Sequence, residues 1–271
     1  MISSLIYDYH NPCKFKYNKS KYELPEYIKQ EINENWKNLY NSGKRFLNGD
    51  LFTVNDIFID EDKTLNFNMI KTNYAHYLYS MKNNFTGKYI CRTVACNILL
   101  LTSDNYFVLG IMDKNTSLPH KIKFIGGAIS EDDLNEDLLD PLKCITRETC
   151  EEIGFNLDNN SYILKPEPRY IVTRKHWSFF NILFYTHLQI PKNDLTKIFN
   201  RHKAYSQNKN SVELDSIIFI NNQKKAIDSF LDENKGRLID YLEEFFIVLT
   251  GKLDANDIIK EVNSFNSNRG S

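Results

Sequence analysis

Hydrophobic residues recur along the first third of the chain at spacings typical of one long helix, two strands and one short helix. A helix is expected over 25–40, because apolar residues recur there at the helical period and a proline opens the segment. Strands are expected at 51–58 and 65–70, joined by a polar hairpin turn, and a short helix at 74–81. Together these elements predict a small α+β N-terminal module, residues 1–88.

From residue 89 onward the pattern changes to longer apolar strands, which we assign to a second domain, 89–250, followed by a tail, 251–271. A hairpin is expected at its start, and a short strand is expected to end at Gly126-Gly127, before an acidic loop. The remaining expected elements are strands at 93–101, 106–112, 123–125, 169–173, 179–188 and 216–220, and helices at 194–202 and 224–249. Because strands and helices mix without strict alternation, the pattern indicates an α/β sandwich with a mixed sheet.

One further helix, expected over 140–153, has clear signals at both ends. Asp140 suits the N-cap, Pro141 the first helical position, and Gly154 the C-terminal stop. An apolar stripe that includes Ile145 is suited to packing on a sheet. The helix is therefore expected to be anchored, with a polar edge left over.

Three carboxylates are expected to project together from that edge. Glu148, Glu151 and Glu152 share an arc of roughly 100° when residues are placed at helical spacing. Like charges at this spacing repel, which favours a bound cation, and oxygen ligands are those of Mg²⁺ or Mn²⁺. Arg147 stands four residues before Glu151, where a guanidinium can orient a carboxylate. The alternative interpretation is a solvated acidic face.

The segment 147–155, Arg-Glu-Thr-Cys-Glu-Glu-Ile-Gly-Phe, resembles the core of the Nudix box, R-E-U-x-E-E-x-G-U, in which U is apolar. All five fixed positions match. The resemblance implies a Nudix-type α/β/α sandwich that hydrolyses a diphosphate linkage with Mg²⁺ or Mn²⁺. It also implies that Glu148 and Glu152 are metal ligands, that Glu151 is a third ligand or the residue that activates water, and that Arg147 orients a carboxylate.

The region before the box departs from the family pattern. The nineteen residues 128–146 separate Gly127 from Arg147, where the family pattern G-x5-E-x7-R has thirteen. Leu139 stands where a glutamate is expected, and Thr149 replaces an apolar residue. The acidic loop offers four possible substitutes for the missing glutamate: Glu131, Asp132, Asp133 and Glu136.

Several residues outside the box are candidates for the same site. Gly126 and Gly127 would let backbone groups approach a phosphate. Arg174 is suited to holding phosphate and Trp177 to stacking on a base, although ordinary packing also explains such residues. Glu213, just before a strand, is a candidate additional carboxylate, and its alternative is a surface residue of a loop.

Charge and composition narrow the partners. The formal net charge of −1 disfavours a general electrostatic grip on nucleic acid or anionic membrane, so nucleic acid is not an expected partner. Basic clusters at 121–123 and 174–176 suit a phosphorylated small molecule. Five cysteines without paired spacing predict free thiols, and no signal peptide or long apolar segment is evident. A cytoplasmic protein is expected, and its oligomeric state is left open.

The N-terminal region carries a second resemblance, to the segment that precedes the Nudix domain in UDP-glucose pyrophosphatase-like members. It rests on 46–49, 51–54 and 71–78. It implies hydrolysis of a nucleoside diphosphate sugar, such as UDP-glucose, to a nucleoside monophosphate and a sugar 1-phosphate. The alternatives are an ADP-ribose, dinucleoside polyphosphate or RNA-cap hydrolase, or a non-catalytic Nudix-fold nucleotide-binding module. The sequence does not decide the base, the sugar or the attacked phosphorus.

Overall fold

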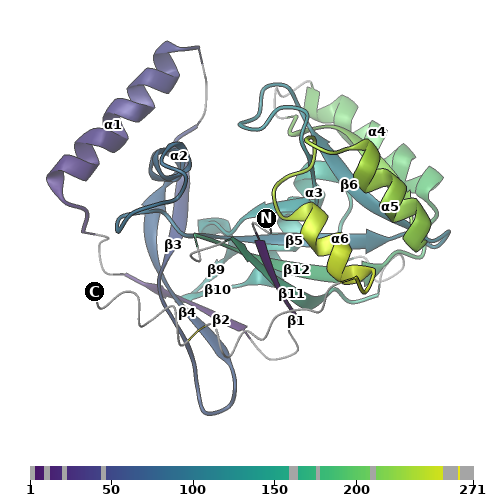
Figure 1. Cartoon of the computed structure of the whole chain (residues 1–271), viewed down its shortest axis with the longest axis horizontal. Coiled ribbons are helices and arrows are strands. Elements are labelled where there is room, and N and C mark those ends of the chain that lie inside the picture. The colour runs from purple at the N-terminus through teal and green to yellow at the C-terminus, as the bar shows by residue number, and fades with distance from the viewer. Residues whose placement is uncertain are drawn as a thin grey trace.

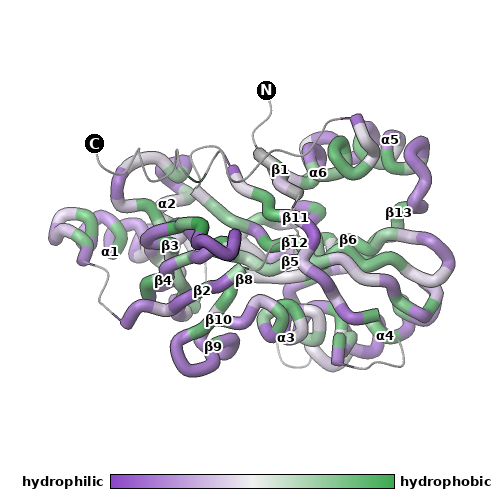
Figure 2. Tube along the Cα trace, turned by 90° about the horizontal axis from the view of Figure 1, so that it is seen from below, coloured by the Kyte–Doolittle hydropathy of each residue, from purple (hydrophilic) through white to green (hydrophobic). Residues whose placement is uncertain are grey.

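The protein has a large mixed sheet between two layers of helices, seen in a computed structural model (Figures 1 and 2). The structure describes residues 4–8, 13–19, 23–43, 47–158, 164–174, 178–207, 212–252 and 262. Its helices are α1 (Glu26–Asn41), α2 (Tyr74–Lys82), α3 (Pro141–Ile153), α4 (Lys192–Gln207), α5 (Lys224–Glu233) and α6 (Leu242–Leu249). In Figure 2, α5 and α6 lie on one side of the sheet and α3 and α4 on the other. The predicted α/β sandwich with a mixed sheet is confirmed.

The strands follow one path with a side branch. They are β1 (Ser4–Asp8), β2 (Cys13–Asn18), β3 (Asp50–Ile59), β4 (Leu65–Asn73), β5 (Thr93–Leu101), β6 (Tyr106–Met112), β7 (Ile122–Lys123), β8 (Ile125–Ala128), β9 (Leu134–Asn135), β10 (Leu138–Leu139), β11 (Glu167–Arg174), β12 (Phe179–His187) and β13 (Leu214–Asn221). The order along the path is β1-β11-β12-β5-β3-β4-β2-β10-β9, and β6, β8, β7 and β13 branch off at β5. The β5–β12 and β2–β4 pairs are parallel and the other pairs antiparallel.

Strand β5 is the centre of this arrangement. All nine of its residues are buried, which is why seven of them are apolar, without polar residues at alternate positions. Its two faces belong to two hydrophobic clusters. One cluster lies under α3 and α4 and includes Ile145 and Ile153, and the other lies under α5 and α6 and includes Phe245 and Phe246.

The strands of the predicted N-terminal module join the same sheet as the second domain. Thr53 of β3 pairs with Thr93 of β5, and β2 pairs with β10. Strand β1, which the sequence pattern did not predict, pairs antiparallel with β11 along its whole length. One continuous sheet therefore crosses the predicted boundary at residue 88. The division into two domains stays a prediction.

Two predicted elements are wrong in detail. The helix expected over 224–249 is two helices, because residues 234–241 leave the helical path at Gly236, whose φ is +81°, and run beside β7. Ile122 donates its N–H to the carbonyl of Arg237 (2.8 Å) and accepts from the N–H of Ile239 (3.0 Å). In addition, the strand expected over 123–125 is divided at Phe124 into β7 and β8, and β8 continues through both glycines.

Two other sequence expectations concern the cysteines and membrane segments. All five cysteines are free thiols, as predicted. None of the helices in the described ranges combines the length and the hydropathy needed to cross a membrane.

The pairing of β1 with β11 generates a stability prediction. Ile6 of β1 is 2% exposed and packs in the cluster under α5 and α6, so Ile6→Ala should lower the free energy of unfolding by about 2–4 kcal/mol. Urea denaturation measures this change. Leu47→Ala, at a side chain that is 87% exposed, is the control and should change it by less than about 0.5 kcal/mol. Equal, small effects of both substitutions would show that β1 is not part of the core.

Candidate active site

Helix α3, which carries the acidic residues, is fixed at both ends and along its buried face. Asp140 caps its N-terminus by accepting a hydrogen bond from the N–H of Leu142 (2.8 Å). Gly154 ends it in the left-handed conformation, with φ +69°. Ile145 and Ile153 are fully buried against the sheet. The predicted caps are confirmed, and the polar edge of the helix is fixed relative to β8.

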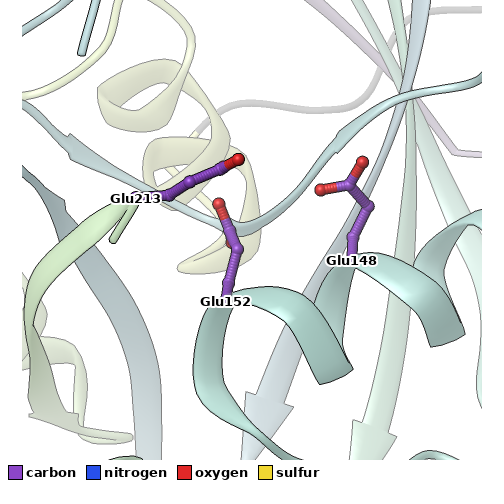
Figure 3. A group of neighbouring side chains, drawn as sticks. All are labelled: Glu148, Glu152 and Glu213. Carbon is purple, nitrogen blue, oxygen red and sulfur yellow. The ribbon is translucent and has the colours of Figure 1, made fainter. Parts of the chain in front are cut away.

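Glu148, Glu152 and Glu213 converge above this edge. One carboxylate oxygen of each lies within 4.8 Å of the others. Figure 3 shows the three carboxylates directed toward a common region, two from α3 and one from the segment just before β13. Glu148 and Glu152 are buried, and Glu213 is exposed. The structure thus brings the candidate additional carboxylate to the box glutamates, across sixty residues of sequence.

Glu151 lies beside this trio but not within it. Its side chain is 56% exposed, and its carboxylate accepts a hydrogen bond from Nη1 of Arg147 at 3.0 Å. It also lines a very small hollow, of about 10 Å³, together with Glu152 and Glu213. Its role as third ligand or water-activating residue stays a prediction.

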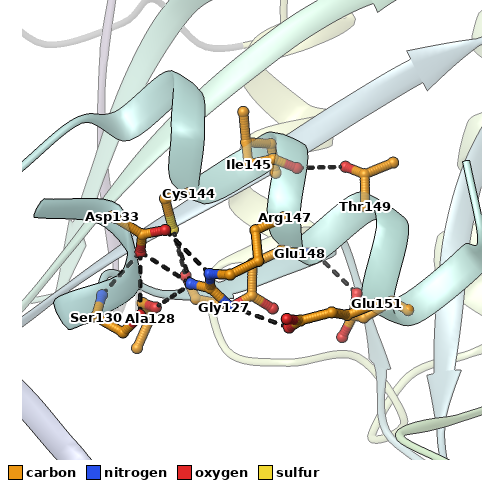
Figure 4. A network of polar contacts seen from close by, with 12 residues as sticks. Gly127, Ala128, Ser130, Asp133, Cys144, Ile145, Arg147, Glu148, Thr149 and Glu151 are labelled. Carbon is orange, nitrogen blue, oxygen red and sulfur yellow. Dashed lines mark hydrogen bonds and ion pairs between the residues drawn. The ribbon is translucent and has the colours of Figure 1, made fainter. Parts of the chain in front are cut away.

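Arg147 is held by a buried aspartate (Figure 4). Asp133 accepts from Nε at 3.0 Å and from Nη2 at 2.9 Å, the two-bonded geometry in which a guanidinium holds a carboxylate most firmly. Nη1 is left to donate to Glu148 (2.8 Å) as well as Glu151. Among the four candidate substitutes for the missing glutamate, Asp133 is the residue that contacts Arg147, whereas Glu131 pairs with Lys71 (2.6 Å).

A sequence signal for Asp133 was present. Asp133 accepts from the N–H of Ser130 (2.8 Å) and the two form a capping box at the 3₁₀ turn η1 (Glu131–Asp133). Ser or Thr followed three residues later by an acidic residue is a recognised pattern for such a box. Thr149, the other departure, donates its hydroxyl to the carbonyl of Ile145 (2.7 Å), so it packs in the buried face as an apolar residue would.

Lys123 provides a positive charge inside the site. Its ammonium lies 2.5 Å from Glu152 Oε1 and donates to the carbonyl of Gly126 (2.7 Å). The other oxygen of Glu152 accepts from the N–H of Gly126 (2.9 Å). The sequence pattern identified Lys123 only as part of the basic cluster 121–123. Lys121 of that cluster does not reach the carboxylates and donates instead to the carbonyl of Gly236 (2.6 Å).

The charges of neighbouring side chains shift the pKa values of the residues in this site. Burial, and then repulsion by Glu152, raises the pKa of Glu148 to about 8, although Arg147 and Lys123 act in the opposite direction. Burial also raises the pKa of Glu152, partly offset by Lys123. Burial alone would lower the pKa of Lys123, but attraction by Glu152 outweighs it and the pKa is raised. The carboxylates therefore need additional positive charge to be fully ionised near neutral pH.

A divalent cation fits this arrangement. The donors are carboxylate oxygens, the ligands that Mg²⁺ and Mn²⁺ prefer. Gly127 leaves room for one of them, because a Cβ at this position would lie 2.4 Å from Oε2 of Glu148. The residues that would hold the cation are Glu148, Glu152 and Glu213.

A cavity of about 270 Å³ opens beside this cluster and includes Lys123, Gly126 and Gly127 in its wall. Arg174 lines it too, paired with Asp240 (Nη2 to Oδ1, 3.1 Å, and a second, shorter contact from Nε). The predicted base-stacking residue Trp177 lies outside the described residues, as do Lys175 and His176.

Comparisons with known proteins give matches only in structure. No family model matches, and no curated protein matches. The chain is similar to DR0079 from Deinococcus radiodurans (15% identity, 57% of this chain and 81% of that chain, TM-score 0.39) and to the MutT protein from Methanosarcina mazei Go1 (13%, 59% and 94%, 0.36). It is also similar to a hydrolase of the NUDIX family from Clostridium perfringens (14%, 61% and 100%, 0.33). These identities and TM-scores are low, so the function has to be inferred from the geometry and charge of the site.

The raised pKa of Glu148 predicts a pH dependence of stability. The folded state binds this proton more tightly than the unfolded state, whose glutamate pKa is about 4.3, so the metal-free protein should lose stability as pH rises from about 4.5 to about 8. Urea denaturation in EDTA at several pH values measures this loss. Glu148→Gln should flatten the curve in this window, and saturating Mn²⁺ should stabilise the wild type most at the upper end. Parallel curves for wild type and variant would contradict the assignment.

The two glycines of β8 predict different defects. Gly127→Ala should displace only the flexible end of Glu148, so Mn²⁺ binding should weaken about 10- to 100-fold with little loss of stability. Gly126→Ala meets backbone, with the carbonyl of Cys96 2.2 Å from the new Cβ and φ at +133°, and should cost at least about 2 kcal/mol in unfolding free energy. Calorimetric titration with Mn²⁺ and urea denaturation check the pair. Similar stability losses in both variants would be inconsistent with this geometry.

Proposed function

We propose that this chain is a Nudix-type hydrolase that cleaves the diphosphate linkage of a nucleoside diphosphate derivative with the help of Mg²⁺ or Mn²⁺. The observation that carries the proposal is the convergence of Glu148, Glu152 and Glu213 beside a cavity that contains positive charge. Crowded, partly buried carboxylates are costly unless a cation neutralises them. A solvated acidic face, the alternative interpretation, does not account for their burial.

A divalent cation held by these carboxylates supplies charge neutralisation for the diphosphate oxygens and a water with a lowered pKa. The chain's own groups orient the site. Arg147 bridges Glu148 and Glu151, and Asp133 fixes its guanidinium. Lys123 holds Glu152 and reaches the cavity wall, where its charge favours an incoming phosphate.

Glu151 is the carboxylate assigned to accept a proton from the attacking water. It lies outside the group of three converging carboxylates, its side chain is partly exposed, and Arg147 keeps it next to Glu148. A general base needs access to solvent water while staying within reach of the reacting atoms, and Glu151 meets both conditions better than the buried Glu152.

Nucleoside diphosphate sugars such as UDP-glucose are the leading substrates, on the N-terminal resemblance at 46–49, 51–54 and 71–78. The partner is therefore a small molecule, and the net charge of −1 gives no support to a nucleic-acid substrate. A cytoplasmic location remains part of this proposal.

A substrate panel tests the activity. UDP-glucose, ADP-ribose, a dinucleoside polyphosphate and capped RNA are incubated with Mg²⁺ or Mn²⁺, and the phosphorylated products are identified. We expect UDP-glucose to yield UMP and glucose 1-phosphate. No phosphorylated product from any member of the panel would leave only the non-catalytic nucleotide-binding module.

Two glutamine variants then separate the roles of the glutamates. Glu152→Gln should lose both Mn²⁺ binding and turnover, whereas Glu151→Gln should keep Mn²⁺ binding and lose about 10²- to 10⁴-fold in kcat. Glu233→Gln on α5, at an exposed position, is the matched control and should behave as wild type. Full activity of Glu152→Gln would refute the ligand assignment, and full activity of Glu151→Gln the proton-acceptor role.

A further inference from the structure

The cavity beside the carboxylates has aromatic walls from distant parts of the chain. Tyr74 and Tyr77 of α2 have ring centroids 5.7 Å apart and nearly parallel planes (23°). Phe179 and Tyr241 form a second stacked pair, at 5.7 Å and 20°. We call the cavity lined by these four residues the aromatic pocket. Its walls offer flat faces for a planar ring.

The aromatic pocket is continuous with the charged part of the site. Lys123 lines it and lies 2.5 Å from Glu152. A second hollow, which Glu151, Glu152 and Glu213 help to line, has a volume of only about 10 Å³. Of these two hollows, only the aromatic pocket is large enough to enclose one of the two groups that a diphosphate joins.

The chemistry of the walls favours a base over a sugar as the enclosed group. Most residues that line the aromatic pocket are aromatic or aliphatic, among them Leu51, Met112, Leu118 and Ile239. A hydroxyl-rich sugar would lose its hydrogen bonds to water against such a surface. A nucleobase has two flat faces that stack on aromatic side chains and gain free energy there.

Arg174 adds a polar preference to the pocket. Its Nε and Nη2 are engaged by Asp240, and its guanidinium lies 5.0 Å from the ring centroids of Phe85 and Phe179. Its Nη1 is buried and has no hydrogen-bond partner among the described residues. A buried donor without a partner is costly, and an acceptor on the ligand removes that cost. The exocyclic carbonyl oxygens of uracil are such acceptors. Adenine accepts only at its ring nitrogens, and its exocyclic group is an amino donor, which a guanidinium N–H cannot bind.

We infer that the aromatic pocket binds the nucleobase and, through Arg174, selects a carbonyl-bearing base such as uracil over adenine. The inference rests on the proposed function only for placing the diphosphate at the carboxylates. It gives the N-terminal segment a role at the site, because Tyr74 and Tyr77 of α2 form one wall of the pocket.

Nucleotide binding without catalysis tests the pocket. Isothermal titration calorimetry of the metal-free full chain with UMP and AMP should show at least about tenfold tighter binding of UMP, since a buried N–H donor that pairs with an exocyclic carbonyl oxygen rejects a base whose exocyclic group is an amino donor. Tyr77→Leu should weaken UMP binding at least about fivefold, the lower end of base-stacking losses. Arg174→Lys keeps a charge beside Asp240 but loses the planar fork, and should bring the UMP and AMP affinities close together.

Tyr79→Leu is the matched control, a tyrosine on the same helix that packs toward α1 and hydrogen-bonds Glu31 (2.5 Å). It should bind UMP as wild type does. If thermal melting shows that Tyr77→Leu is not folded, Tyr74→Leu takes its place. Equal affinity for UMP and AMP in the wild type, or unchanged UMP affinity in the folded wall variant, would overturn the inference. Selective UMP binding without hydrolysis of any diphosphate would uphold the pocket and refute only the enzymatic proposal.

Discussion

Two carboxylates in a space nearly closed to water impose the main constraint on this protein. The side chains of Glu148 and Glu152 are 10% and 0% exposed, respectively, and repulsion between them opposes their joint ionisation. Neighbouring groups reduce that cost from two sides, with Arg147 next to Glu148 and Lys123 next to Glu152. Hydrogen bonds fix both basic side chains, Arg147 to Asp133 and Lys123 to the carbonyl of Gly126. The structure around the site therefore balances a local excess of negative charge.

This excess of negative charge explains the buried Asp133 and the long loop that carries it. Asp133 would be a buried charge without a purpose, but it locks the guanidinium of Arg147 by two hydrogen bonds. The segment before α3 contains the 3₁₀ turn, which ends at Asp133, and the paired short strands β9 and β10. The loop is longer than the pattern that the sequence resembles, and Asp133, rather than a residue at position 139, supplies the carboxylate that binds Arg147.

The sequence predicted what depends on local physics. The apolar run of β5 and the caps of α3 are encoded within a few residues, and both were found from pattern alone. What it did not predict depends on tertiary pairing. Strand β1 is five residues long and exists by pairing with β11. Glu213 was a candidate from the sequence, but a surface loop residue was the alternative there, and only the course of β13 brings it to the site. The break between α5 and α6 was missed because the apolar spacing continues across it, while the hydrogen bonds of Ile122 to residues 237 and 239 decide the geometry.

That break has a consequence for the order in which a working site is assembled during synthesis. The segment 237–239 closes the edge of β7, the strand that carries Lys123, and it leads directly into Tyr241. A nascent chain that has emerged only as far as α5 would already contain the three converging carboxylates. It would still lack Tyr241, which stacks on Phe179 in the aromatic pocket, and the segment that pairs with β7. The segment after α5 thus completes a site whose acidic groups were synthesised earlier, and a chain that stalls at α5 would hold those groups beside an unfinished pocket.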